Sequence, residues 1–267
     1  PRWRYNSYAE ENKLNFLSVI NSEIFPNKIK SNSAQLNNKA INILIAGCGT
    51  GIQILEASRY SNCEITAIDL SNSSISYAKR KVDEYGLKNV DFIEMDLLEL
   101  TALNKRFDLI ECSGVLHHMN SPNEGLEALL SCSNKNSYIK LGIYSELARE
   151  SIINARNYIK SENICSTQKG IREFRQIVKQ DKSNNLKDLM NWSDFYTTSM
   201  CRDLCFNLKE HRYNIKKIES CLKRFDLDFL GFVLPNKTKE DFKRIYPNPN
   251  DLKNLTYWQE YELKERN

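Results

Sequence analysis

The sequence lacks any long apolar run. No stretch approaches the roughly 20 apolar residues that a helix needs to cross a bilayer. The N-terminal segment also lacks the apolar core of a signal peptide, because Trp3, Tyr5 and Tyr8 stand there among polar residues. These absences argue against a membrane-spanning protein, and we expect a cytoplasmic location and no membrane partner.

A strong net charge is missing too. The 38 lysines and arginines are interleaved with 34 aspartates and glutamates, and the formal net charge is only +4. A nucleic-acid-binding protein would concentrate its basic residues in a patch or stripe. We therefore expect no nucleic-acid partner.

Paired cysteine motifs are absent as well. None of the eight cysteines lies in the C-x-x-C spacing that builds zinc sites and redox centres. Cys201 and Cys205 are four residues apart, with His211 six residues further on, but these are too few ligands for a zinc site. We predict reduced thiols and no bound metal.

The chain does contain enough apolar material for a sizeable core. Its 267 residues are 41% hydrophobic, and no internal repeat is visible. Because the chain begins at Pro1 and not at Met, we expect it to be a piece of a longer protein. The expected parts are a leader (1–38), an α/β core (39–144 and 213–234), an inserted helical lid (145–212) and a C-terminal extension (235–267).

Strand and helix patterns alternate along the core. Apolar runs separated by helical segments favour parallel βαβ crossovers, buried on both faces. The predicted fold is therefore α/β, a doubly wound and mostly parallel sheet of Rossmann-like type. Strands are expected at 41–45, 64–68, 90–94, 107–112, 137–143 and 228–233, and helices at 10–20, 53–59, 73–85, 123–132 and 215–224.

A glycine-rich turn follows the first strand of this core. The segment Ile43–Gly51 runs from a strand through Gly47, Gly49 and Gly51 into a helix. Glycines can adopt positive φ and let a ligand approach the backbone. The helix that follows offers free N–H groups and the positive end of its dipole. The segment therefore predicts a nucleotide-type site.

Two carboxylates end the next two strands. Asp69 lies 18 residues after Gly51, where it can accept hydrogen bonds from both hydroxyls of a ribose. Asp96 ends the third strand, where it can meet an adenine amino group. The G-x-G-x-G spacing, in place of G-x-G-x-x-G, favours a cofactor without a pyrophosphate.

With these motifs the sequence resembles the class I S-adenosylmethionine-dependent methyltransferases, over roughly 41–143 and 215–233. The resemblance implies S-adenosyl-L-methionine as cofactor and S-adenosyl-L-homocysteine as product. The glycines would lie under the methionine end, Asp69 would hold the ribose and Asp96 the adenine. The full predicted cofactor set is Gly47, Cys48, Gly49, Gly51, Gln53, Asp69, Leu70, Asp96, Leu97 and Ser113.

The sequence departs from that family in two places. The family usually has Asp or Glu two residues before the first glycine, and here that position is Ile45. The fold also normally ends in an antiparallel strand pair, and after Val233 no second strand is visible.

A narrower resemblance rests on four segments of the chain. Together they resemble the methyltransferase half of bacterial proteins that carry tetratricopeptide repeats ahead of it. The resemblance implies an N-terminal tetratricopeptide-repeat region. The segments are Leu44–Gly51, Asp194–Tyr196, Cys201–Asp203 and Glu210–Arg212.

Residues for the chemistry are fewer. His117 and His118 follow the fourth strand, whose end would face the transferable methyl group, and an imidazole there could take a proton at neutral pH. Ordering of the loop is an equally good explanation for one of them. We also expect substrate-binding residues in the leader, in the lid and where the lid meets the core, namely Tyr5, Tyr144, Tyr196, Arg202 and His211.

The predicted function is methyl transfer to an oxygen or nitrogen acceptor, on a small molecule rather than on a protein side chain. Two alternatives remain open. One is a nicotinamide-dependent Rossmann oxidoreductase, which shares the sheet and the acidic ribose partner. The other is a non-catalytic module that binds S-adenosylmethionine and uses its lid to bind a protein.

Overall fold

The computed structural model describes residues 15–26, 40–181, 186–207, 209–248 and 251–264. Its centre is a five-stranded sheet with the strand order β4-β3-β2-β5-β6. All four pairings in this sheet are parallel, so the predicted doubly wound α/β fold is confirmed. The strands are β2 (Ile41–Ala46), β3 (Cys63–Asp69), β4 (Val90–Glu94), β5 (Phe107–Ser113) and β6 (Ser133–Gly142).

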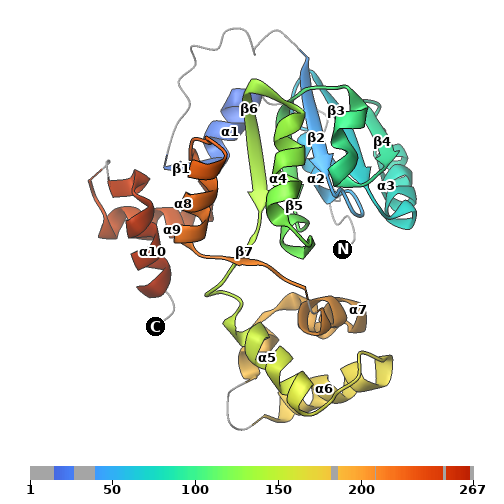
Figure 1. Ribbon diagram of the computed structural model, residues 1–267, viewed down its shortest axis with the longest axis vertical. Coiled ribbons are helices and arrows are strands. Elements are labelled where there is room, and N and C mark those ends of the chain that lie inside the picture. The colour runs from blue at the N-terminus through green and yellow to red at the C-terminus, as the bar shows by residue number, and fades with distance from the viewer. Residues whose placement is uncertain (1–14, 27–39, 182–185, 208, 249–250, 265–267) are drawn as a thin grey trace.

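Alternate residues of each central strand face opposite sides of the sheet. Ile43 and Ile45 of β2 join one apolar cluster, whereas Leu44 and Ala46 join the other. The first cluster packs under three helices, and the second under a 3₁₀ helix and α4 (Figure 1). The helices are α1 (Phe16–Glu23), α2 (Ile52–Ala57), α3 (Asn72–Glu84), the 3₁₀ helix Leu97–Leu103 and α4 (Pro122–Ser131).

Polar side chains fix where several helices begin. Asn15, Ser71 and Ser121 each accept a hydrogen bond from a backbone N–H in the first turn of α1, α3 and α4. Pro122 occupies the first turn of α4, where its missing N–H removes no hydrogen bond. Between residues 41 and 143 the predicted strands and helices agree with the observed ones to within a few residues, whereas the helix expected at 10–20 lies partly outside the described residues and its described part is α1.

The described residues between 145 and 212 are mostly helical, with a small apolar core of their own that includes Ile152, Phe174 and Phe195. We call them the helical unit. In Figure 1 the unit lies beyond the end to which β6 points, which is the carboxyl edge of the sheet. Two short parallel strands, β7 (Tyr144–Ser145) and β8 (Arg212–Tyr213), connect the unit to the sheet. Its helices are α5 (Glu150–Ser161), α6 (Gln168–Gln180) and α7 (Thr198–Cys201), with a π-helix over Arg202–Phe206.

One prediction about the sheet was wrong. The strand expected at 228–233 was assigned to the core, but β9 (Gly231–Val233) pairs antiparallel with β1 (Ile24–Pro26) in a separate sheet. The reason is aromatic packing, since Phe25 and Phe232 both lie against Trp258. The antiparallel partner that was not visible after Val233 comes from a segment that precedes the core.

The C-terminal extension is helical and packs around this small sheet. Phe242 stacks on Trp258 with the ring centroids 3.6 Å apart. Among the residues that the structure describes, no helix is long and apolar enough to cross a membrane. The helices of the extension are α9 (Asn236–Ile245) and α10 (Leu255–Lys264), and α8 (Ile215–Arg224) precedes β9.

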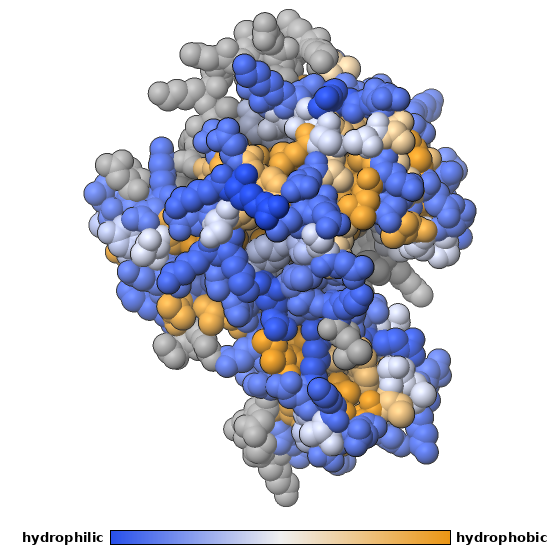
Figure 2. All heavy atoms as spheres, viewed as in Figure 1, coloured by the Kyte–Doolittle hydropathy of each residue, from blue (hydrophilic) through white to orange (hydrophobic). Residues whose placement is uncertain are grey.

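The visible face is mostly hydrophilic (Figure 2). Its hydrophobic atoms form separate patches over the sheet domain and over the helical unit, with a hydrophilic band between them. Polar contacts are therefore expected where the two meet.

Candidate functional site

The glycine loop joins β2 to α2 at the carboxyl edge of the sheet. Gly47, Gly49 and Gly51 all have positive φ, at 74°, 50° and 92°. The N–H groups of Gly47 and Cys48 both donate to the carbonyl of Ile68, each at 2.9 Å. This pairing with the end of β3 fixes the loop against the sheet.

Two of these glycines have different surroundings. A Cβ at Gly47 would collide with Cγ2 of Val115, so the backbone there is in close contact with the turn after β5. Among the residues that the structure describes, no atom would lie within 4 Å of a Cβ added at Gly49. The loop therefore packs on the protein at Gly47 and borders open space at Gly49.

Asp69 ties the end of β3 to this loop. One carboxylate oxygen accepts from the N–H of Gly49 at 2.7 Å, and the other accepts from the N–H of Ser71 at 2.8 Å. A carboxylate has about four lone-pair sites, so both oxygens can still accept further hydrogen bonds. Asp69 can thus orient the loop and hold a hydroxyl-bearing ligand together.

Other predicted cofactor residues surround this edge. Asp96 accepts from the N–H of Leu98 at 2.9 Å and begins the 3₁₀ helix that buries Leu97. Leu70 follows Asp69 with 69% of its surface exposed. An exposed leucine next to Asp69 offers an apolar surface to a flat ring.

Cys48, Gln53 and Ser113 complete that predicted set. Burial, and next the charge of Asp69, raise the pKa of the Cys48 thiol to about 12, so it is an apolar wall and no nucleophile. Gln53 lies in the first turn of α2, partly exposed. Ser113 lies against Gly142, where an added Cβ would stand 2.7 Å from its Oγ.

A carboxylate of a neighbouring strand lies beside the position where the family has an acidic residue. Ile45 is buried, and Glu111 of β5 lies in register with it. Burial raises the pKa of Glu111, although Lys140 at 3.6 Å acts in the opposite direction. Glu111 was not among the predicted site residues, because strand pairing was needed to bring it beside β2.

The turn after β5 carries the two histidines. His117 is fully buried, with its ring 3.8 Å from that of Tyr144 and 4.3 Å from that of His118. Burial, and next the neighbouring His118, lower the pKa of His117 to about 4. His117 is therefore neutral near pH 7 and a weak proton acceptor. Its ring packs against Tyr144 and His118, and its catalytic role stays a prediction.

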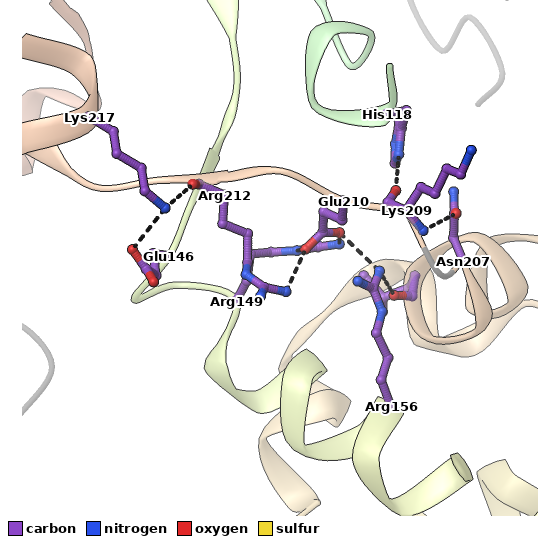
Figure 3. A network of polar contacts seen from close by, with 10 residues as sticks. His118, Glu146, Arg149, Arg156, Asn207, Lys209, Glu210, Arg212 and Lys217 are labelled. Atoms are coloured by element: carbon purple, nitrogen blue, oxygen red, sulfur yellow. Dashed lines mark hydrogen bonds and ion pairs between the residues drawn. The ribbon is translucent and has the colours of Figure 1, made fainter. Parts of the chain in front are cut away.

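An ionic network lies below this turn, at the junction with the helical unit (Figure 3). The Glu210 side chain is only 1% exposed and receives two hydrogen bonds from Arg149. Arg156 lies 2.9 Å from the same carboxylate, and Arg212 lies 3.8 Å away. Burial alone would raise the pKa of Glu210, but Arg149 and then Arg156 outweigh it and hold that pKa below its usual value. The guanidinium of Arg149 also lies 3.9 Å over the Tyr144 ring.

Comparison with known proteins identifies part of this arrangement. Residues 43–135 match the family of methyltransferase domains. These residues hold the glycine loop, Asp69, Asp96 and the turn after β5. Residues 43–135 are a methyltransferase domain. The match and the parallel sheet confirm the predicted class I S-adenosylmethionine-dependent methyltransferase at the level of this domain, and they favour it over the nicotinamide-dependent alternative.

Individual relatives extend the likeness beyond the methyltransferase domain. An uncharacterized protein of Synechococcus sp. is 28% identical over 236 residues, which are 84% of this chain and 56% of that protein. The ubiquinone biosynthesis O-methyltransferase of Coxiella burnetii is 32% identical over 110 residues, or 41% of this chain and 44% of that enzyme. The structure of PKMT2 from Rickettsia typhi aligns with a TM-score of 0.67 at 17% identity, covering 98% of this chain and 52% of that one. The chain thus spans about half the length of these relatives.

The predicted substrate-binding residues lie outside or at the border of the methyltransferase domain. Tyr144 belongs to the junction, as described above. The Tyr196 hydroxyl donates to the carbonyl of Met190, and Arg202 donates to the carbonyl of Ser166. Both side chains therefore form hydrogen bonds within the helical unit. The exposed His211 contributes its backbone N–H to the carbonyl of His117 at 2.7 Å.

The structure and the comparisons give no information on two of the predictions. Tyr5 lies outside the described residues. The tetratricopeptide-repeat region is not tested by these comparisons and stays a prediction. Within the described ranges no group of three or more His, Cys, Asp or Glu side chains could hold a metal ion.

Sequence reasoning missed the most buried charges of the site. Arg149 and Arg156 were not predicted, and Glu210 was noted only as part of a motif. The available signal was the charged segment Glu210–Arg212, and its partners on α5 are about sixty residues away in the sequence.

Proposed function

We propose that this protein transfers a methyl group from S-adenosylmethionine to an oxygen or nitrogen acceptor on a small molecule. The observation that carries the proposal is the glycine loop, which has open space at Gly49 and the Asp69 carboxylate hydrogen-bonded to the same residue. Parallel α/β sheets bind their ligands at the carboxyl ends of the strands. Because residues 43–135 match a methyltransferase domain, we expect the methyl donor at that place.

The residues present fit the donor. Gly49 leaves room for a ligand against the backbone, and α2 begins at Gly51 without a side-chain cap, so its first N–H groups can bind an electronegative group. Asp69 has free lone pairs for the ribose hydroxyls, and the exposed Leu70 offers the adenine an apolar face. When bound, S-adenosylmethionine supplies an electrophilic methyl carbon, to which the acceptor's electron pair bonds while the carbon–sulfur pair leaves with sulfur.

The helical unit supports the small-molecule preference. It lies at the same edge of the sheet as the glycine loop (Figure 1). Near its junction with the sheet it bears an open cavity of about 640 Å³, lined by residues that include Leu147, Glu150, Asp188 and Trp192. A hollow of that size can admit a small-molecule ligand, and its lining residues all belong to the helical unit. The similarity to an O-methyltransferase of ubiquinone biosynthesis and to a probable (S)-tetrahydroprotoberberine N-methyltransferase of Papaver bracteatum supports an acceptor atom that is either oxygen or nitrogen.

Turnover tests this proposal. The full chain is incubated with methyl-labelled S-adenosylmethionine and a panel of phenols, alcohols, amines, carboxylic acids and lysine-containing peptides. We expect label transfer to a phenol, alcohol or amine. Cofactor binding without transfer to any member would favour the non-catalytic module, and binding of NADH in place of S-adenosylmethionine would favour the oxidoreductase.

A further inference from the structure

His118 lies on the turn after β5, which is in contact with the glycine loop. Its backbone N–H donates to the carbonyl of Val115 at 2.9 Å, and Val115 is the residue that packs against Gly47. Because β5 ends at this turn, His118 stands at the same edge of the sheet as the glycine loop. It is partly exposed, in contrast to the fully buried His117.

One nitrogen of His118 has a defined partner. Nδ1 lies 3.1 Å from the backbone carbonyl oxygen of Lys209 (Figure 3). A carbonyl oxygen can only accept a hydrogen bond, so Nδ1 must carry the proton. In a neutral imidazole the other nitrogen, Nε2, then bears the free lone pair. Within the part of the chain that the structure describes, no hydrogen bond is found at Nε2.

Lys209 is itself held in place on both sides. Its Nζ donates to Oδ1 of Asn120 at 2.7 Å, and the next N–H but one, that of His211, donates to the carbonyl of His117 at 2.7 Å. Between them, Glu210 points into the helical unit and binds Arg149 and Arg156. Residues 209–211 therefore connect α5 to the histidine turn.

We propose that His118 Nε2 is the proton acceptor of the reaction, that the Lys209 carbonyl fixes its tautomer, and that Glu210 is the positioning residue for that carbonyl. The inference rests on the proposed function. It assigns the helical unit a part in the chemistry, because the orienting group of the base comes from the segment that Arg149 and Arg156 hold.

The proposal narrows the class of acceptor. A base speeds the reaction only when the acceptor arrives with a proton to lose. Nε2 takes the proton from an O–H or N–H group while the electron pair of that atom forms the new bond to carbon. The acceptor is then a hydroxyl or amine compound, and a carboxylate, which has no proton to lose at neutral pH, would draw no benefit from His118.

Nitrogen NMR of the labelled full chain tests the tautomer. The chain has only three histidines, so the variants His118→Gln and His211→Gln assign their ring signals. We expect His118 to show a protonated Nδ1 and a bare Nε2, although free histidine side chains in water favour the opposite form. In Glu210→Gln we expect loss of that signature, with Nε2–H becoming the major form. Glu219→Gln, an exposed glutamate paired with Lys223 at 3.4 Å, is the matched control and should leave the signature unchanged.

A second variant keeps the test valid if Glu210→Gln does not fold. Arg156→Gln removes one of the two close cations and is expected to shift the tautomer in the same direction by a smaller amount. A wild-type His118 in the Nε2–H form would overturn the proposal. An unchanged tautomer in the folded variants would also overturn it.

Kinetics test the role of the base itself. With a hydroxyl or amine acceptor from the panel, His118→Gln should lower kcat by about 10²- to 10⁴-fold, the usual contribution of a general base, with a smaller change in KM. An unchanged kcat would overturn the assignment. Calorimetry with S-adenosylhomocysteine separates the two hypotheses, because Glu210→Gln should keep wild-type affinity, whereas no binding to the wild type would defeat the proposed function alone.

Discussion

The glycine loop and the junction below it hold their residues by different means. The loop is held by its backbone, because three glycines have positive φ and the Ile68 carbonyl accepts hydrogen bonds from two N–H groups of the loop. The junction is held by buried charges, because the Glu210 carboxylate forms ion pairs with both Arg149 and Arg156. The first arrangement joins neighbouring strands at a separation of 20 residues, as between Gly49 and Asp69, whereas the second joins residues 61 apart, Arg149 and Glu210.

This difference separates two tasks. A backbone loop can approach a ligand closely and keeps its shape with few side chains. A buried ion network is sensitive to loss of its closest partner, because a buried charge left alone is strongly destabilising. We infer that the loop sets cofactor affinity and that the junction sets the placement of the helical unit.

The largest expected effect is at the junction. Arg149→Met removes the two hydrogen bonds to Glu210 and the contact with the Tyr144 ring. We expect a loss of about 3 to 5 kcal/mol, as for a broken buried ion pair, measured by urea unfolding. The control is Arg202→Met on the exposed side of the helical unit, which should change stability by less than about 0.5 kcal/mol. Equal effects of the two variants would contradict the account.

Acid should weaken the same junction through His117. Its pKa is about 4 in the fold and near 6.5 when unfolded, so the unfolded chain binds the proton first as the pH falls. Stability is therefore full above about pH 6.5 and declines toward pH 4, by on the order of 3 kcal/mol. The groups that face His117 are His118, Tyr144, Arg149 and Glu210.

Unfolding curves at several pH values check this decline. His117→Phe should abolish it between pH 6.5 and 4, whereas His211→Gln, at an exposed position, should keep it. Glu210 contributes in a separate window, because its pKa is held below its usual value. Its stabilisation is present above about pH 4.3, the value of an unperturbed glutamate, and is lost as the pH falls through the lower pKa of the folded state. If stability still declines between pH 6.5 and 4 in His117→Phe, a group other than His117 causes the decline.

The two glycines sharpen the comparison from the side of the loop. Gly47→Ala meets positive φ strain and a collision with Val115, and should cost about 2 to 3 kcal/mol. Gly49→Ala meets only the strain, for about 1 kcal/mol, but places a methyl group in the space proposed for the cofactor. Val115→Ala should rescue part of the stability of Gly47→Ala and none of the binding lost in Gly49→Ala. Calorimetry and urea unfolding on the same variants decide between these outcomes.

The smallest effect is expected at the edge of the ion network. Arg212 lies 3.8 Å from Glu210, and 30% of its side chain is exposed. Arg212→Gln should therefore cost less than about 1 kcal/mol, as for other solvent-screened pairs. A loss as large as that of Arg149→Met would mean that the network is held from β8 and not from α5.

The sequence predicts most of the core and of the cofactor edge, because those features are local. Glycine spacing, strand ends and helix caps all lie within a few residues of what they control. Glu111 beside Ile45 and Glu210 beside Arg149 depend on pairing between distant segments, and no local pattern carries that information. The prediction for the strand at 228–233 was wrong for the same reason. Its pairing with β1 depends on aromatic contacts of the distant Trp258.

Binding of S-adenosylhomocysteine to the full chain tests the central claim most directly. Titration calorimetry should show one site in the wild type. In Asp69→Ala the affinity should fall about 10- to 100-fold, because hydrogen bonds to a charged group contribute about 1.5 to 3 kcal/mol. Asp91→Ala, at an exposed position of β4, should bind as the wild type does. No binding by the wild type, or equal binding by Asp69→Ala, would contradict the account.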